Sequence, residues 1–292
     1  MFEGSMVAIV TPFKKGKVDF KALSALIEWH IAEGTDVIIP CGTTGESATL
    51  DFDEHKKVVE HTVKVVKGRV PVMAGTGANS TAEAIDLTVS ARKAGADGAL
   101  LVTPYYNKPT QEGLYQHYKA IAEAVKGFPL VLYNVPGRTA LNMTPATVVR
   151  LAKISNIVGI KEATGDMAQV SDLIRLTPKS FSVFSGDDPT NLALYALGGK
   201  GAISVVANVL PAKCAAMWDA WSAGDMDKAR KIHYELEPMA DAMFIETNPV
   251  PVKTSLAMMR KCAEEFRLPL CAMSRDNKAK LKAVLKSYRL VR

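Results

Sequence analysis

The sequence predicts a protein of the α/β class, a (β/α)8 TIM barrel followed by a C-terminal helical extension. Eight short, mostly apolar, β-rich runs recur between Met6 and Val206, and helical patterns fill the intervals. Strand–helix alternation of this kind requires a parallel sheet with crossover helices. Eight such units without a change in composition favour closure into a barrel over an open sheet, and barrels of similar length fold as one unit.

The eight predicted strands follow one another along the chain. They are Met6–Val10, Asp36–Pro40, Val70–Ala74, Gly98–Val102, Leu130–Tyr133, Ile157–Lys161, Phe181–Ser185 and Ala202–Val206. Several are almost continuously apolar, as is typical of parallel strands covered on both faces. Helix starts are indicated by a capping-box pattern at Ser80–Glu83, and by a capping residue before proline at Thr144-Pro145 and Asp188-Pro189.

The alternation stops after Val206. From Pro211 onward the sequence shows only helical patterns, enough for three to four helices. No linker or low-complexity stretch separates them from the preceding units. We therefore predict a barrel over residues 1–210 and, over residues 211–292, a helical extension that packs on the barrel.

Composition and charge exclude several classes of protein. Hydrophobic residues make up 48% of the chain and charged residues 23%, which predicts a large buried core. The net charge of +6 is mild, and the densest basic stretch, Lys278–Arg292, has apolar residues at helical spacing. Such a stretch is typical of a solvated helix face, so no nucleic-acid partner is expected.

The chain shows no pattern of export or membrane insertion. Met1–Gly4 lacks the basic segment of a signal peptide, and no apolar run approaches the roughly 18 residues that cross a membrane. The four cysteines form no CxxC pair and no metal-like spacing with histidine. We therefore expect reduced thiols and a cytoplasmic protein.

Neither a metal nor a dissociable cofactor is predicted. His55 and His61 are six residues apart and would not share a helix face. Gly75–Gly77 lacks the third glycine of a nucleotide-binding fingerprint and is typical of a turn. Asp187 and Asp188 could bind a cation, but helix capping by Asp188 would explain half of that pair.

Polar, glycine-rich and aromatic residues collect at the C-terminal ends of the predicted strands. The segments are Cys41–Ser47, Gly75–Asn79, Thr103–Asn107, Tyr133–Thr139, Lys161–Gly165, Ser185–Asp188 and Ala207–Asn208. The loops at the opposite ends look like plain turns. Because barrel enzymes act from the C-terminal rim, this asymmetry predicts an active site there.

Lys161 is the strongest candidate for catalysis. It ends an apolar strand, and alternation places it on the same side as Gly159, which would leave room for it inside the barrel. Burial disfavours the charged ammonium, and the neutral amine is the nucleophile of Schiff-base enzymes. The alternative is a strand-end lysine that reaches solvent or pairs with Glu162.

Two neighbouring features fit this chemistry. Tyr133 ends the preceding strand and should lie beside Lys161, where a phenol can transfer protons, although it could instead be a core aromatic. The turn Gly42–Gly45 offers backbone N–H groups and two hydroxyls to a carboxylate, although glycine-rich turns are common. Together they predict capture of a small 2-keto acid, followed by the making or breaking of a carbon–carbon bond.

Four motifs in order carry a family resemblance. They are Gly42–Ser47, Tyr105–Asn107, Tyr133–Thr139 and Gly159–Ala163. With them the chain resembles the dihydrodipicolinate synthases of the pyruvate-dependent class I aldolase superfamily, from Phe2 to at least Lys253. The resemblance implies condensation of pyruvate with L-aspartate 4-semialdehyde to 4-hydroxy-tetrahydrodipicolinate, an intermediate toward lysine and diaminopimelate.

The resemblance also implies roles for the pyruvate half of the reaction. Pyruvate would form an imine with Lys161 without any cofactor, and its carboxylate would bind Thr43 and Thr44. Tyr133, Thr44 and Tyr106 would form a proton relay. Tyr106 would reach in from a neighbouring subunit, because the family is usually a homotetramer.

For the second substrate, the resemblance implies that Arg138 binds the carboxylate of the aldehyde, and that backbone at Gly186 and Ile203 lines the pocket. The closest alternative is another pyruvate-dependent aldolase, such as a sugar-acid or N-acetylneuraminate lyase. A bidentate guanidinium at Arg138 fits a carboxylate better than a polyol. A non-catalytic keto-acid-binding barrel is the other alternative, against which the proton relay argues.

An L-lysine effector site is a further implication, since feedback-regulated members of the family carry one at a subunit interface. The matching positions are Ser47, Ala48, His55, Asn79, Glu83 and Tyr105. Phe52 stands where some regulated relatives carry histidine, which removes a polar contact. The alternative is that Glu83 only completes a capping box and that His55 lies on a solvated helix face.

Overall fold

The computed structural model describes residues 2–292, and eight parallel strands form its main sheet. The strand order is β4-β1-β10-β9-β8-β7-β6-β5, and a parallel bridge between Ile38 and Val72 joins its two ends. The strands are β1 Gly4–Ala8, β4 Val37–Ile39, β5 Met73–Gly75, β6 Gly98–Val102, β7 Leu130–Asn134, β8 Ile157–Glu162, β9 Ser182–Ser185 and β10 Gly201–Ser204. The eight predicted strands and the (β/α)8 barrel are confirmed.

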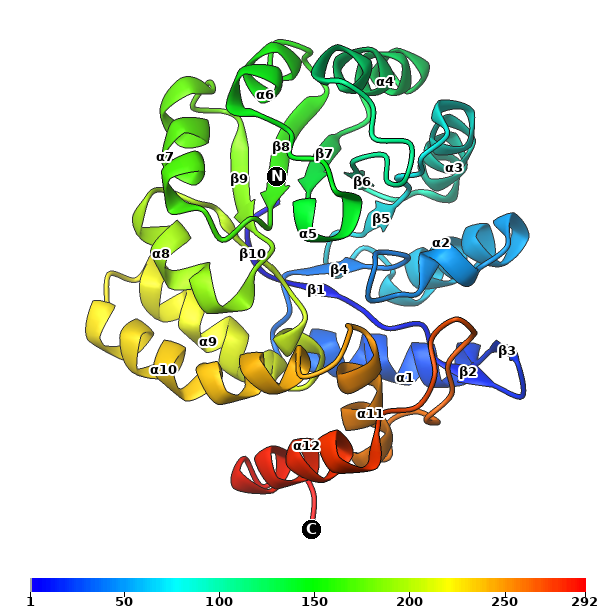
Figure 1. Ribbon diagram of the computed structural model, residues 1–292, viewed down its shortest axis with the longest axis vertical. Coiled ribbons are helices and arrows are strands. Elements are labelled where there is room, and N and C mark those ends of the chain that lie inside the picture. The colour runs from blue at the N-terminus through cyan, green and yellow to red at the C-terminus, as the bar shows by residue number, and fades with distance from the viewer. Residues whose placement is uncertain (1) are drawn as a thin grey trace.

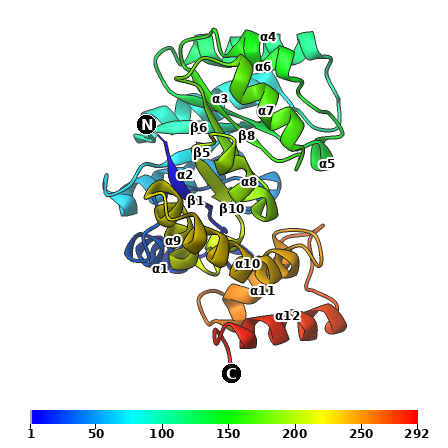
Figure 2. The same cartoon turned by 90° about the vertical axis from the view of Figure 1, so that its left-hand side faces the viewer.

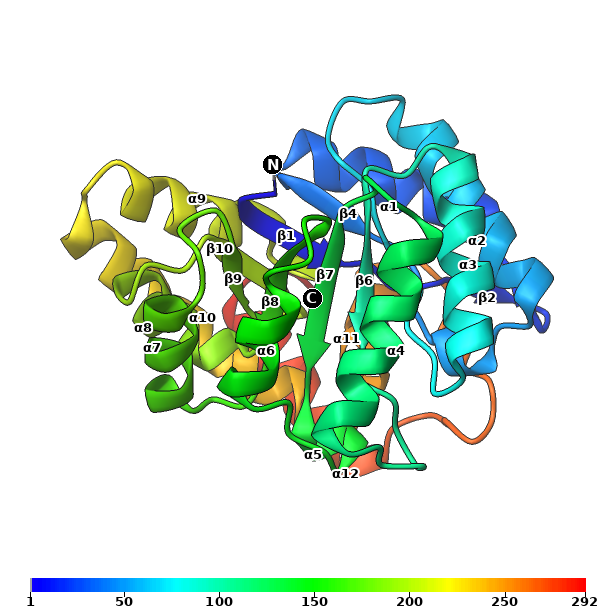
Figure 3. The same cartoon turned by 90° about the horizontal axis from the view of Figure 1, so that it is seen from above.

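Helices surround the strands, as Figure 1 shows. They are α1 Phe20–Ala32, α2 Phe52–Val66, α3 Thr81–Ala94, α4 Gln111–Ala124, α6 Pro145–Leu151, α7 Met167–Leu176, α8 Asn191–Ala196 and α9 Pro211–Ser222. Neighbours such as α3 and α4 lie side by side on the outside of the barrel (Figure 3). Short helical turns follow some strands, namely η1 Ser47–Thr49, α5 Pro136–Thr139, η2 Asp188–Thr190 and η3 Val206–Asn208.

Alternate residues of each strand face two separate cores. In β7, Val131 and Tyr133 belong to a small cluster inside the barrel, together with Phe184 of β9. Leu130 and Leu132 belong to the larger cluster between the strands and the helices. A side chain on the inner face near the end of a strand is therefore enclosed by apolar neighbours.

The C-terminal extension continues the outer core. It contains α10 Met226–Met243, α11 Val250–Met258 and α12 Arg275–Ser287, with α12 at the opposite end of the molecule from α4 (Figures 1 and 2). Buried residues of these helices, including Met239, Leu256 and Leu281, belong to the same cluster as the barrel helices. A helical C-terminal extension is confirmed, although α9, which the prediction placed in the extension, lies with the helices that surround the strands. The loops of the extension approach the C-terminal rim of the barrel, as described below.

Two predicted helix starts differ in detail. Ser80 Oγ accepts a hydrogen bond from the Glu83 backbone N–H (3.5 Å), whereas the reciprocal capping box lies at Asp51 and Glu54 in α2. Asp188 does not cap a helix before proline; it is the first residue of η2. Its carboxylate accepts from two backbone N–H groups just beyond β10, at 2.9 and 3.1 Å. The carboxylate thus binds donors that lie outside the strand ladder, which a local pattern cannot reveal.

A small hairpin, β2 Phe13–Lys14 and β3 Lys17–Val18, was not predicted. Its strands are two residues long and too short for a periodic pattern. The turn is permitted by Gly16, whose φ of 76° lies in the left-handed region.

Several further features concern the chain as a whole. All four cysteines are free thiols, and Cys41 and Cys214 are buried. Across residues 2–292, no helix combines the length and apolar character needed to cross a membrane. The same residues contain no group of three His, Cys, Asp or Glu side chains placed to hold a metal ion.

Candidate active site

Lys161 lies inside the barrel near the C-terminal end of β8. In the register of the sheet it stands beside Tyr133 of β7 and Phe184 of β9, which both face the inner cluster. Only 5% of Lys161 is exposed, and its Nζ lies 4.2 Å from the centroid of the Tyr133 ring. The two side chains are therefore neighbours, as predicted, and Lys161 does not reach solvent.

Glu162 faces the outer side of β8. Its carboxylate accepts hydrogen bonds from Asn134 Nδ2 (3.1 and 3.2 Å), Gln169 Nε2 (3.1 Å) and the backbone N–H of Thr164 (3.0 Å). Burial raises the pKa of Glu162, and these donors oppose the shift. The alternative in which Lys161 pairs with Glu162 is wrong, because the carboxylate is engaged on the other face of the strand.

Gly186 supplies the space that Lys161 occupies. A Cβ at position 186 would lie 2.6 Å from Lys161 Cε and 2.8 Å from Ala163 Cβ. The space was predicted at Gly159, but a Cβ there would instead lie 2.5 Å from the backbone oxygen of Ser182. Gly159 therefore permits the close approach of β9, and Gly186 makes room for the lysine.

The turn Gly42–Gly45 follows β4 and brings two threonines to the rim. Backbone hydrogen bonds of 3.0 and 3.1 Å close the turn. Thr44 is buried, and its Oγ1 accepts a hydrogen bond from Asn248 Nδ2 (3.0 Å). Thr43 borders both the open pocket at the rim and a small cavity of about 30 Å³ that Tyr133 also lines. Thr43 thus connects the space beside Tyr133 with the pocket.

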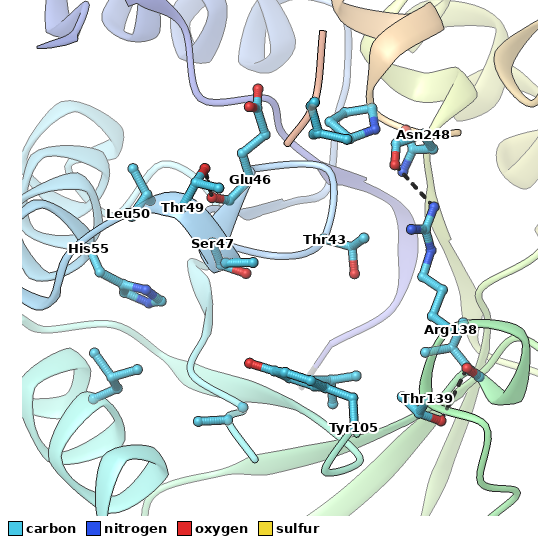
Figure 4. Close-up of a pocket in the computed structure, with 18 of the residues that line it drawn as sticks. Thr43, Glu46, Ser47, Thr49, Leu50, His55, Tyr105, Arg138, Thr139 and Asn248 are labelled. Atoms are coloured by element: carbon cyan, nitrogen blue, oxygen red, sulfur yellow. Dashed lines mark hydrogen bonds between the residues drawn. The ribbon is translucent and has the colours of Figure 1, made fainter. Parts of the chain in front are cut away.

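The pocket at the rim has a volume of about 450 Å³ (Figure 4). Arg138 of α5 lies at one side of it and donates from Nη2 to the backbone oxygen of Asn248 (3.1 Å). Figure 4 shows Thr43 between Ser47 and Arg138, with the ring of Tyr105 on the opposite edge of the pocket from Thr43. A guanidinium and a threonine hydroxyl therefore border the same space, which suits an anionic ligand.

A buried ion pair lies next to the threonine turn. Glu46 has a φ of 54°, and its carboxylate pairs with Nζ of Lys253 in α11, with both side chains fully buried. The Lys253 ammonium also lies 3.9 Å from the centroid of the Phe13 ring. Burial lowers the pKa of Lys253, and the charge of Glu46 opposes this shift. The pair ties the turn that carries Thr43 and Thr44 to the C-terminal extension.

The two tyrosines of the loop after β6 differ in exposure. Tyr106 is 92% exposed, with a φ of 71°. Tyr105 borders the pocket, and burial, together with the charge of Glu83, raises its pKa. A single chain thus places Tyr133 beside Lys161 and leaves Tyr106 on the surface.

Five of the six positions predicted for an L-lysine effector line the pocket. They are Ser47, Ala48, His55, Glu83 and Tyr105. The sixth, Asn79, donates from Nδ2 to the backbone oxygen of Tyr105 (3.3 Å). His55 does not lie on a solvated helix face: it is buried, and a ring nitrogen lies 2.8 Å from the backbone oxygen of Gly75. Burial also lowers the pKa of His55, which favours the neutral ring, and the hydrogen bond to Gly75 opposes this shift.

Three residues that contact or support this site were not predicted, namely Asn248, Glu46 and Lys253. Glu46 was part of a quoted motif but had no assigned role. Asn248 and Lys253 belong to the extension, for which only helices were predicted. The one local signal is Thr247-Asn248-Pro249, a polar break between helical patterns that could have indicated a loop at the rim.

A closed parallel barrel with a buried lysine beside a tyrosine at its C-terminal rim is the arrangement expected of a Schiff-base enzyme of the class I aldolase type. The comparisons with known proteins refine this class. The sequence model of the dihydrodipicolinate synthetase family matches residues 1–288, and the chain belongs to that family.

The chain is similar over its whole length to curated relatives. It is 67% identical over 292 residues to the 4-hydroxy-tetrahydrodipicolinate synthase of Thermodesulfovibrio yellowstonii, with 100% of each chain covered. The crystal structure of dihydrodipicolinate synthase from Aquifex aeolicus superimposes with a TM-score of 0.98, at 51% identity and 99% coverage of both chains.

Two similar structures contain small molecules. The Acinetobacter baumannii enzyme, complexed with pyruvate, has a TM-score of 0.97, at 49% identity and full coverage of both chains. The Cyanidioschyzon merolae enzyme, with lysine bound, has a TM-score of 0.96, at 38% identity and 99% coverage of both chains.

Proposed function

We propose that this chain condenses pyruvate with L-aspartate 4-semialdehyde to 4-hydroxy-tetrahydrodipicolinate, through an imine on Lys161. The observation that carries the proposal is the environment of Lys161 in a chain of this family. The amine is buried beside Tyr133 at the end of β8, and within residues 2–292 it makes no ion pair. A lysine without a carboxylate partner is free to attack a carbonyl carbon.

The imine step requires two proton transfers. Nζ of Lys161 attacks C2 of pyruvate, and the carbonyl oxygen takes up two protons and leaves as water. Tyr133 and Thr44 carry protons between nitrogen and oxygen. Loss of a proton from C3 gives the enamine, whose C3 bonds to the aldehyde carbon of the second substrate. The amino group of that substrate then attacks C2, closes the ring and releases the lysine.

The two carboxylates have separate binding groups in this proposal. The pyruvate carboxylate binds the Thr43 hydroxyl and the backbone N–H groups at Thr43 and Thr44. Arg138 borders the open pocket and binds the carboxylate of the aldehyde. Gly186 and Ile203 line the inner end, where the glycine leaves the lysine unobstructed.

The proposal needs a second copy of the chain and no added cofactor, because the lysine imine itself withdraws electrons from C3. Tyr106 is 92% exposed, which fits insertion into a neighbouring subunit, where it completes the relay with Tyr133 and Thr44. We propose a homotetramer, which is the assembly that the family resemblance implies. The four free thiols fit a cytoplasmic enzyme.

L-lysine is the proposed effector. The support is the pocket itself, where Glu83 supplies a negative charge and Tyr105 a hydroxyl, together with the lysine-bound relative from Cyanidioschyzon merolae. The wall formed by Phe52 is apolar and 44% exposed, which suits the methylenes of the ligand.

Reductive trapping tests the nucleophile. The protein is incubated with pyruvate and borohydride, and peptide mapping should place the added group on Lys161. Lys161→Ala should lose the adduct and nearly all turnover, whereas Lys200→Ala, at a half-exposed lysine, should lose neither. An adduct on another lysine contradicts the mechanism.

Steady-state turnover tests the substrates. Pyruvate with aspartate semialdehyde should give product, whereas N-acetylneuraminate and sugar acids should not be cleaved. Trapping without turnover of any of these substrates would favour a non-catalytic keto-acid-binding barrel.

A further inference from the structure

Asn248 reaches Thr44 from the C-terminal extension. It lies between α10 and α11, 204 positions from Thr44 in sequence, and only 4% of it is exposed. Nδ2 donates to Thr44 Oγ1 (3.0 Å), and the backbone oxygen of Asn248 accepts from Arg138 Nη2 (3.1 Å). One loop therefore contacts both the relay threonine and the guanidinium, the first through its side chain and the second through its backbone.

The direction of the hydrogen bond between Asn248 and Thr44 matters for proton transfer. A threonine hydroxyl carries one proton and two acceptor lone pairs. When the Asn248 amide donates to Oγ1, that proton remains free for another acceptor. If an acceptor stood at the same place, the Thr44 proton would be held there and the relay would be interrupted.

The side-chain oxygen of Asn248 supports a functional reason for an asparagine at this position. Within residues 2–292, Oδ1 is buried and has no hydrogen-bond partner. An unsatisfied buried acceptor is unfavourable, and a smaller or apolar residue would avoid it. The amide is therefore poorly explained by packing alone.

We infer that Asn248 is a positioning residue for the reaction: its amide donates to Thr44 Oγ1 and so leaves the hydroxyl proton available to Tyr133. This inference rests on the proposed function, in which Thr44 and Tyr133 transfer protons. It assigns part of the active site to the C-terminal extension.

Two variants of Asn248 test whether a hydrogen-bond donor to Thr44 is needed at this position. Asn248→Ala removes the donor and should lower kcat about 10-fold, because Thr44 can still rotate into place. Asn248→Asp puts an acceptor at the same place and should lower kcat about 100-fold at neutral pH, the scale of one acid–base group. The Arg138 contact is made by backbone, so KM for the aldehyde should change little in either variant.

The pH profile distinguishes positioning from simple loss of structure. When the introduced carboxyl of Asn248→Asp is protonated, it can donate to Thr44 again. The kcat of this variant relative to the unchanged protein should rise as pH falls, while the same ratio for Asn248→Ala stays flat. Equal kcat values and parallel pH profiles for the two variants would overturn the inference.

A double-mutant cycle gives an independent test. In a Thr44→Val background, Asn248→Ala should cause no further loss of kcat, because its effect acts through the hydroxyl. Additive losses contradict the inference, and Asn248→Ser replaces the alanine variant in the cycle if that variant does not fold. Borohydride trapping of the unchanged protein keeps the two proposals apart, since failure to trap Lys161 there refutes the proposed function itself.

Discussion

Replacing Gly186 by alanine should disable Lys161 while leaving the barrel folded. The new methyl carbon would lie 2.6 Å from Lys161 Cε, 2.9 Å from Lys161 Cγ and 2.8 Å from Ala163 Cβ. Carbon atoms pack at about 3.5–4.0 Å, so roughly 1 Å of overlap must be relieved on both sides. The lysine is the more mobile neighbour and should leave its rotamer at a cost of about 1 kcal/mol. A displacement of about 1 Å from the reacting position lowers rates about 100-fold.

The assay for Gly186→Ala is the rate of borohydride-trapped adduct on Lys161 at saturating pyruvate, followed by kcat. Both should fall about 100-fold, and the melting temperature should change by only a few degrees. Gly137→Ala is the matched control, because a Cβ at that rim position has no atom within 4 Å apart from its chain neighbours and the backbone of its own helix. Trapping of Gly186→Ala at the unchanged rate would refute the assignment of Gly186 as the residue that makes room for the lysine.

Three further predictions follow from the same structure. Arg138→Lys keeps the positive charge but loses the planar guanidinium, so kcat/KM for aspartate semialdehyde should fall roughly 10–100-fold. Borohydride trapping of pyruvate should be preserved. An equal loss of trapping contradicts the role assigned to Arg138. L-lysine at millimolar concentration should inhibit turnover partially and should not compete with pyruvate. Glu83→Ala should raise the lysine concentration that gives half-maximal inhibition about 10-fold. Inhibition that is purely competitive with pyruvate excludes this pocket as the effector site. Burial lowers the pKa of His30 to about 3 and that of His117 to about 4, so both are neutral when folded, whereas the unfolded chain binds protons below about pH 6.5. The free energy of unfolding by urea should therefore fall as pH decreases from about 6.5 toward 4, by up to about 1.4 kcal/mol per pH unit for each histidine. His30→Gln should flatten the slope, and an unchanged slope contradicts this origin.

The barrel could be predicted because parallel strands covered on both faces leave an apolar signal in the sequence. The pairing of Tyr133 with Lys161 could be predicted as well, since both end consecutive strands. The hairpin at Phe13–Val18 could not, because strands of two residues carry no period. The fold and the family could thus be predicted from local sequence patterns and short motifs.

The contacts that support the candidate site could not be predicted from local sequence patterns. Nothing local distinguishes Asn248, which contacts a turn 204 residues away, from an asparagine in an ordinary Asn-Pro turn. Strand alternation pointed to Gly159, in the same strand as Lys161, and only the packing of adjacent strands shows that Gly186, just beyond β9, accommodates the lysine. Lys253 lies in a helical pattern, where a lysine is usually solvated, and its burial depends on Glu46.

The buried pair of Glu46 and Lys253 has a consequence for the order in which the protein is made. A ribosome releases the residues of all eight strands before it has synthesised Lys253. Until then Glu46 has no cationic partner, and an unpaired buried carboxylate costs about 3–5 kcal/mol. Until α11 has been synthesised, the threonine turn therefore lacks the ion pair that joins it to the C-terminal extension. A polypeptide that ended before Asn248 would contain Lys161 but lack the loop that contacts Thr44 and Arg138.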